Sequence, residues 1–264
     1  MKGIRDGFSA SYSINISLEG MFSRNEKMTC LIHAKNRDKI LIASDSWNKF
    51  NGEPNRAKHL IKKICVNKKY PLIIASAGEN GIKYFNGRTY YIYDMMNDFC
   101  NEYNGQNFND CFNKLTNKTS QILNDLLFLS KEDNIQNGYP AHKVVQYFIS
   151  YYDINTHNII SEVYEFIRYK NSQTFLNENV KKMNVFFSSF GTYAQDINYK
   201  YANVNIDSYP NSLLEKEVFK VIDNFIQNEK YKFIDDISIG GPIQWAIIYN
   251  NGKLKTNLDN FNTY

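Results

Sequence analysis

The sequence predicts an α+β protein in which two stacked β-sheets are covered by helices on their outer faces. The predicted elements run strands, two helices, strands, helix, strands, which is neither a regular βαβ alternation nor a meander. Continuous apolar runs such as Leu72–Ala77 are typical of strands covered on both faces. The predicted helices each carry one apolar face. Two stacked sheets with helices outside would bury all of these surfaces.

The first third of the domain is expected to hold four short strands separated by turns. Asn36–Asp38 reads as a hairpin turn and Trp47–His59 as a polar loop with Gly52 and Pro54. The expected strands are Thr29–Lys35, Lys39–Ser44, Lys62–Val66 and Leu72–Ala77.

The remainder alternates between helical and strand patterns. Apolar residues from Ile82 to Phe99 recur at a rough helical spacing, and polar Arg168–Lys182 permits no assignment. The other helices are expected at Phe108–Leu129, from Tyr193 onward and at Ser212–Glu229. The other strands are expected at Val144–Tyr152, Ile159–Phe166, Asn184–Ser188, Ile243–Tyr249 and Lys253–Leu254.

Composition excludes several classes of function. The chain has 264 residues, 43% hydrophobic, without repeats or linkers, so we expect one domain at residues 29–264. Residues 1–28 lack the apolar core of a signal peptide and read as an N-terminal extension or propeptide. No apolar run approaches about 18 residues, which argues against a membrane span. A net charge of +4 without a basic run argues against nucleic acid.

The cysteines and histidines do not suggest a metal site or a cofactor, and we expect neither. Four cysteines without C-x-x-C spacing are expected to be reduced, mostly buried thiols of a cytoplasmic protein. The four histidines are not clustered along the chain.

Four residues at the ends of the first strands form a possible catalytic group. Thr29 begins the first strand, Asp45 follows the second, Lys63 begins the third and Gly78 follows the fourth. A threonine hydroxyl becomes nucleophilic when its own α-amine, freed at a chain start, removes the proton. A nearby lysine lowers that amine's pKa, a carboxylate holds the lysine, and a glycine N–H stabilises an oxyanion. Lys62 competes with Lys63 for the lysine role.

The run T-C-L-I-H-A-K-N-R-D-K-I-L-I-A-S-D-S resembles the opening strand pair of proteasome β-type subunits and their bacterial relatives, in the N-terminal nucleophile (Ntn) hydrolase superfamily. K-K-I-C-V resembles the family's third strand and I-A-S-A-G its oxyanion corner. The resemblance implies that Thr29 is the nucleophile, Asp45 the carboxylate, Lys63 the lysine and Gly78 the oxyanion donor. It also implies a four-layer αββα sandwich, the Ntn-hydrolase fold.

Two segments near the C-terminus extend the resemblance. D-D-I-S-I-G-G-P-I-Q-W-A-I-I is similar to the family's acidic residue, Gly-Gly turn and following strand, which implies that Asp236 is a supporting carboxylate. F-F-S-S-F-G-T-Y-A is similar to the family's serine-containing segment, which implies that Ser189 is a supporting serine.

The resemblance implies a threonine-type peptidase that acts on peptides or unfolded proteins. Thr29 would be exposed by processing or by translation from Met28. The chain would form a homo-oligomeric ring or spiral, which an ATP-dependent unfoldase could serve. A catalytically inactive assembly or binding module is the alternative, because Met28 stands where the family has glycine and Ile239 where it has serine. An amidase acting on a small molecule is a third reading. Trp47 is interpreted as a packing residue or as one that shapes access to the site.

Overall fold

The computed structural model describes residues 29–48, 59–78, 81–83, 89–129, 141–169, 176–182, 187–191, 194–204, 209–229 and 239–261. The strands are β1 (Cys30–Lys35), β2 (Lys39–Ser44), β3 (Trp47–Asn48), β4 (His59–Leu60), β5 (Ile64–Asn67), β6 (Leu72–Gly78), β7 (Gly81–Lys83), β8 (Thr89–Tyr91), β9 (Ala141–Asp153), β10 (Asn158–Tyr169), β11 (Leu176–Lys182), β12 (Phe187–Gly191), β13 (Gln244–Tyr249) and β14 (Leu254–Thr256). The helices are α1 (Ile92–Glu102), α2 (Phe108–Leu129), α3 (Ala194–Tyr201) and α4 (Asn211–Glu229).

Two five-stranded sheets form the centre of the molecule. The first sheet has the strand order β12-β1-β2-β13-β14, and the second sheet has the order β11-β10-β9-β6-β5. Neighbouring strands in both sheets are antiparallel. The pairs β3–β4 and β7–β8 form two small additional ribbons. Because β1, β2 and β13 are adjacent, residues near 29, 45 and 244 come to one end of the first sheet.

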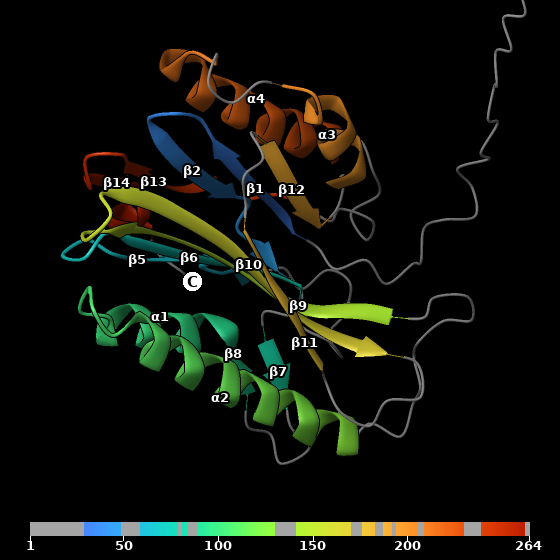
Figure 1. Ribbon diagram of the computed structural model, residues 1–264. Coiled ribbons are helices and arrows are strands. Elements are labelled where there is room, and N and C mark those ends of the chain that lie inside the picture. Colours follow the sequence, from blue (N-terminus) through green and yellow to red (C-terminus); the bar gives the residue numbers. More distant parts are fainter. Residues whose placement is uncertain are drawn as a thin grey trace, which may run out of the picture.

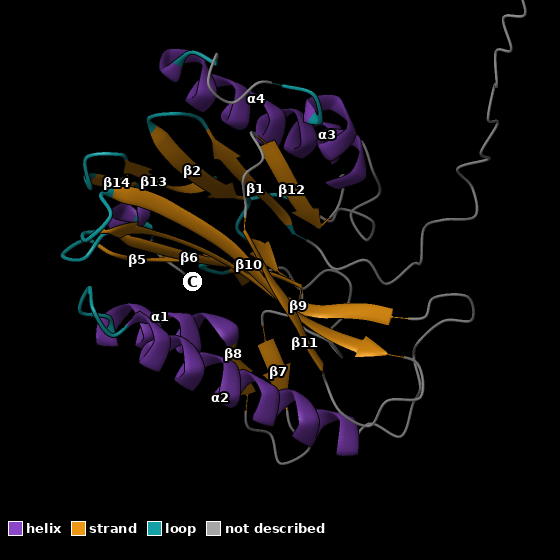
Figure 2. Ribbon diagram, in the orientation of Figure 1, coloured by secondary structure: helices purple, strands orange, loops and turns teal. Residues whose placement is uncertain are grey.

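The sheets stack face to face and helices cover both outer faces (Figures 1 and 2). Alternate residues of β1 separate these layers, as the period of a strand requires. Leu31 lies in the core between the sheets, whereas Cys30 and Ile32 pack toward α3 and α4. On the other side α1 and α2 cover the second sheet with a core that includes Met96, Phe99, Leu115 and Tyr147. The predicted α+β sandwich of two antiparallel sheets with outer helices is therefore confirmed in outline.

Polar side chains also join the two sheets. His33 of β1 lies with its Nε2 2.7 Å from the Ser161 hydroxyl of β10, and Ser161 lies 2.6 Å from the hydroxyl of Ser150 in β9. All three residues are buried. Burial, with a smaller contribution from the charge of Lys35, lowers the pKa of His33 to about 3. His33 is therefore a neutral side chain that links the layers.

Two sequence predictions of local structure are wrong, and one stretch without an assignment contains a strand. Ile82 lies in β7, and the first helix begins only at Ile92, because the Tyr-rich stretch before it pairs as β8. The polar stretch 168–182 contains β11, an edge strand that pairs only with β10 and therefore needs less apolar surface. The strand expected at Asn184–Ser188 is β12, which begins at Phe187 and ends at Gly191.

Candidate functional site

The hairpin of β1 and β2 brings Asp45 against the residue that follows Thr29. The Asp45 N–H donates to the carbonyl of Cys30 at 3.1 Å, and the Cys30 N–H donates to Asp45 Oδ1 at 2.9 Å. The register of the strand pair fixes this contact between Cys30 and Asp45, since Leu31 lies opposite Ser44. Thr29 directly precedes β1 and its exposed fraction is 1%. Two of the predicted residues are therefore neighbours at one end of the first sheet.

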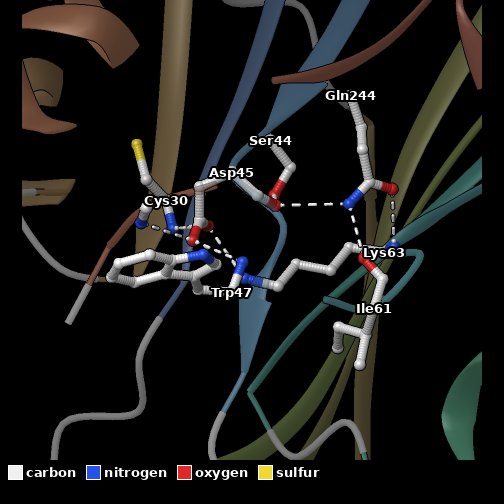
Figure 3. A network of polar contacts seen from close by, with 8 residues as sticks. Cys30, Ser44, Asp45, Trp47, Ile61, Lys63 and Gln244 are labelled. Atoms are coloured by element: carbon white, nitrogen blue, oxygen red, sulfur yellow. Dashed lines mark hydrogen bonds and ion pairs between the residues drawn. The ribbon is translucent and has the colours of Figure 1, made fainter. Parts of the chain in front are cut away.

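Lys63 reaches the same carboxylate from the second sheet. Its Nζ lies 2.8 Å from Asp45 Oδ1, and both side chains are fully buried. Figure 3 shows the lysine chain extending toward the carboxylate, with Cys30 and Trp47 beside the pair. Lys63 immediately precedes β5, so the ion pair connects the two sheets. An ion pair removed from water keeps its interaction strong and holds both groups in one geometry.

Backbone groups complete the surroundings of Asp45. Oδ2 accepts hydrogen bonds from the N–H groups of Trp47 and Gly240, each at 3.3 Å. Burial raises the pKa of the Asp45 carboxyl, and the Lys63 ammonium and the N–H donors of Cys30 and Gly240 oppose that shift. Every one of these partners is a donor, which is the arrangement that an ionised carboxylate requires.

The structure also shows which of the two candidate lysines pairs with Asp45. Lys62, the neighbour of Lys63, places its Nζ 6.0 Å from the centre of the Tyr93 ring, a cation–π contact outside the ion pair. Because adjacent residues in an extended chain project to opposite sides, only one of the two can reach Asp45. Lys63 is that residue.

Gly78 ends β6 in a conformation that other residues rarely adopt. Its φ is +98°, and a Cβ added there would lie 2.2 Å from the carbonyl oxygen of Val144. Two residues earlier, the N–H of Ser76 donates to the carbonyl of Lys63 at 3.0 Å. Gly78 therefore lies about 7 Å along β6 from the backbone of Lys63. The positive φ and the close Val144 carbonyl require glycine at this position, but the described chain continues as strand β7 and not as the expected helix.

The other two predicted residues are only partly located. Ser189 lies in β12 with its backbone opposite Ile32 of β1, in the strand next to Thr29. Asp236 lies outside the described residues, as do Met28 and the segment 1–28. The following residue that is described, Ile239, is 1% exposed and packs in the core beneath α4.

Trp47 and the Gly-Gly turn form one packed unit beside Asp45. A Cβ on Gly240 would lie 2.5 Å from Trp47 Cε3, and one on Gly241 would lie 2.6 Å from Trp47 Cδ1. The N–H groups of Ser46 and Trp47 both donate to the Gly240 carbonyl at 3.1 Å. The indole is thus seated on the two glycines, which supports the packing interpretation of Trp47.

Gln244 is a site neighbour that sequence reasoning missed. The side chain is fully buried at the start of β13 and contacts the backbones of Lys63, Ile61 and Asp45. The signal was available in the sequence, because a glutamine begins an otherwise largely apolar strand, Q-W-A-I-I-Y. A polar residue in such a strand needs hydrogen-bond partners inside the protein.

Cys30 is not suited to act as a nucleophile despite its position beside Asp45. Burial, and next the negative charge of Asp45, raise the pKa of the Cys30 thiol. The reactive form of a cysteine is the thiolate, so a raised pKa makes the group inert. All four cysteines are buried and free, and each has a raised pKa because of burial.

The described residues contain neither a metal-binding group nor a membrane-spanning helix. Among them no three His, Cys, Asp or Glu side chains are grouped closely enough to hold a metal ion. None of the helices in this part of the chain is long and apolar enough to cross a bilayer.

Comparison with known proteins identifies similar solved structures without assigning a family. No family model matches the chain, and no curated protein matches it. The chain is similar to the Anbu complex from Pseudomonas aeruginosa, solved as a helical assembly, with 11% identity, a TM-score of 0.47, and coverage of 86% of this chain and 85% of that chain. It is also similar to an Anbu Gly-1 mutant from Hyphomicrobium sp. strain MC1, with 11% identity, a TM-score of 0.43, and coverage of 86% of each chain.

These findings correct the family assignment drawn from sequence motifs. The assignment to the proteasome β-type subunits and bacterial proteasome-like peptidases is wrong, since no family model matches the chain. The physical reason is that short motifs at strand ends report local geometry, which is compatible with more than one family.

Proposed function

We propose that the protein is a threonine-type amide hydrolase that cleaves peptide bonds, with Thr29 as nucleophile. The observation that carries the proposal is the buried ion pair of Lys63 and Asp45, held directly against the backbone of Cys30. A fully buried pair is costly to desolvate, and strongly perturbed buried charges gather at functional sites. This pair adjoins the residue whose hydroxyl and amine would react.

Activity requires that the α-amine of Thr29 be free. In the chain that begins at Met1 this nitrogen belongs to the peptide bond with Met28, so it cannot accept a proton. Cleavage of that bond, or translation from Met28 followed by methionine removal, would produce the amine. The amine then takes the proton of the Thr29 hydroxyl as the oxygen attacks the substrate carbonyl, and it gives that proton to the peptide nitrogen as the C–N bond breaks and the amine product leaves. Water then hydrolyses the ester, which releases the carboxylic acid product and restores the Thr29 hydroxyl.

The ion pair would tune this amine. The ammonium of Lys63 favours the neutral, basic form of a nearby amine by like-charge repulsion, and Asp45 keeps the ammonium in place. The N–H of Gly78 would stabilise the oxyanion of the tetrahedral intermediate. We also propose that Ser189 and Asp236 support the Thr29 amine.

The wider context of the activity is also a proposal. The substrate would be a peptide or an unfolded protein, the enzyme a homo-oligomer in the cytoplasm, and an ATP-dependent unfoldase a possible partner. Size-exclusion chromatography with light scattering tests the oligomer, because a monomeric mass near 31 kDa at micromolar concentration would contradict it.

A second candidate function is a non-catalytic assembly or binding module. The burial of Thr29 in the chain that includes residues 1–28 favours it, and so does Ile239, which fills the core where a supporting serine was expected. In that case the ion pair would be a structural link between the sheets. The two candidates differ in whether the Thr29 amine is ever released.

Intact mass and covalent labelling distinguish the candidates. Protein made from its own gene should have a mass that begins at Thr29, and it should cleave fluorogenic peptides. A peptide epoxyketone should add to Thr29, since ring formation with this reagent needs both the hydroxyl and a free α-amine. Thr29→Ala should lose labelling and turnover, while Thr116→Ala, a change at a buried threonine in α2, should retain both. An uncleaved chain without turnover or labelling contradicts the hydrolase.

A further inference from the structure

The side chain of Gln244 is a buried amide beside the Lys63–Asp45 ion pair, between the two sheets. It is fully buried as the first residue of β13 and lies opposite Ser44 of β2, the residue before Asp45. An amide in this setting is tolerated only when its oxygen and nitrogen are hydrogen-bonded. Its hydrogen-bond partners therefore show which segments of the chain the side chain holds in place.

The Gln244 side chain connects the segments that carry both charges. Its Oε1 accepts the N–H of Lys63 at 2.9 Å, and its Nε2 donates to the carbonyls of Ile61 at 2.7 Å and Asp45 at 3.4 Å. Figure 3 shows the amide between the Ile61–Lys63 backbone and the Ser44–Asp45 backbone. The Gln244 side chain of the first sheet thus holds the Ile61–Lys63 segment, which leads into β5 of the second sheet.

The backbone of Lys63 is held from two sides. Its carbonyl accepts the N–H of Ser76 in β6 at 3.0 Å, whereas its N–H donates to Gln244 instead of to a strand. β5 is the edge strand of the second sheet as the described residues define it. The segment that leads into β5 pairs instead with the residues after β2, since the N–H of Ile61 donates to the carbonyl of Ser46 at 2.9 Å. The Gln244 amide then accepts the next buried N–H along this segment, that of Lys63.

We infer that Gln244 is a positioning residue that sets the point from which the Lys63 ammonium reaches Asp45 and the Thr29 amine. This inference rests on the proposed function for its catalytic consequence, while the tether itself rests on the geometry. A lysine side chain is long and flexible, so fixing its backbone on two sides limits where its charge can lie. Loss of the tether should misplace the ammonium and weaken its effect on the amine.

The test uses Gln244→Met, which keeps the length of the side chain and removes its hydrogen bonds. Asn67→Leu is the matched control, because the amide of Asn67 bonds backbone groups of Cys100, Tyr103 and Tyr70 at the other end of β5. Each variant removes a buried or half-buried amide that hydrogen-bonds backbone groups, Gln244 near the start of β5 and Asn67 at its end. Both should lower the melting temperature, so thermal stability serves as the common reference.

Kinetics of peptide hydrolysis should then separate the two variants. For Gln244→Met we expect kcat to fall by up to about 10²-fold with KM nearly unchanged, since misplacement of a catalytic group by about 1 Å has this effect. The acid limb of the kcat/KM profile should move upward by about one pH unit, because a weaker Lys63 field raises the pKa of the amine. Asn67→Leu should leave that limb in place. An unmoved limb in Gln244→Met would overturn the inference.

Hydrogen exchange gives a readout that does not depend on activity. The amide of Lys63 should exchange at least about tenfold faster in Gln244→Met than in the unmodified protein or in Asn67→Leu. Unchanged exchange would overturn the tether whatever the kinetics show. If the unmodified protein has no turnover, the proposed function fails, and faster exchange at Lys63 still supports the tether.

Discussion

The ammonium of Lys63 lies 2.8 Å from the carboxylate of Asp45, across the interface between the two sheets and out of contact with solvent. Each partner enters from a different sheet, so the pair depends on the stacking of the layers and not on either hairpin alone.

Replacing one member of this ion pair should lower the stability of the fold much more than replacing both. Lys63→Met should lower the free energy of unfolding by about 3–5 kcal/mol, because the carboxylate stays buried without its cation. The double variant Lys63→Met/Asp45→Asn should recover most of that loss, since the asparagine oxygen still accepts the Cys30 N–H. Urea denaturation at pH 7 measures both. Equal losses in the single and double variants would contradict this account.

Gly78→Ala should be among the most destabilising single changes in the chain. The new Cβ would lie 2.2 Å from the Val144 carbonyl oxygen, and the alanine would have to adopt a φ of +98°. We therefore expect the free energy of unfolding to fall by at least about 3 kcal/mol. Gly252→Ala is the control, with a φ of +77° and its nearest contacts at 3.1 Å on the Tyr152 ring, and should cost about 1 kcal/mol. Similar unfolding midpoints for the two variants would count against a tight corner at Gly78.

His33 should make stability depend on pH in the acid range. Its pKa is about 3 in the folded protein and about 6.5 when unfolded, so the unfolded state binds the extra proton between these values. Stability should therefore fall as pH drops from about 6.5 toward 3, by up to about 1.4 kcal/mol per pH unit from this residue.

Comparison of variants isolates that contribution. His33→Gln should flatten the dependence of the unfolding free energy on pH by close to one proton between pH 6 and 4. His157→Asn, a change at an exposed histidine, is measured in parallel. A slope that His33→Gln does not alter would show that the buried histidine is not the responsible group.

The two serines on either side of Asp45 should respond in opposite directions to replacement by alanine. The Ser44 hydroxyl donates to the Asp45 carbonyl at 3.0 Å, so Ser44→Ala should cost about 1 kcal/mol. The buried Ser46 hydroxyl has no hydrogen-bond partner among the described residues, so Ser46→Ala should be neutral or stabilising by up to about 1 kcal/mol. Thermal melts of the two variants at one pH test this, and a destabilised Ser46→Ala would indicate a partner for that hydroxyl.

Sequence reasoning succeeded where the determinants were local. β2 was predicted with its observed bounds and β1 to within one residue, because a turn at Asn36–Asp38 between two apolar runs specifies a hairpin without reference to the rest of the chain. The bounds of α2 were also predicted as observed, since its apolar face repeats over many turns.

Sequence reasoning failed where pairing with another strand decides the conformation of a segment. β7 and β8 are three residues each and are strands only because they pair with one another. β11 is polar and is held by the register of β10, which no pattern within residues 176–182 encodes.

The amino-acid sequence by itself determined which chemical groups end the first strands: the hydroxyl of Thr29, the carboxylate of Asp45, the ammonium of Lys63 and the backbone corner at Gly78. Only the tertiary structure decided that Lys63 and not Lys62 meets Asp45, and that Gln244, about 180 residues later in the chain, holds the backbone of Lys63. The physical reason is that strand alternation limits which faces are available, while the stacking of two sheets decides which buried groups become partners.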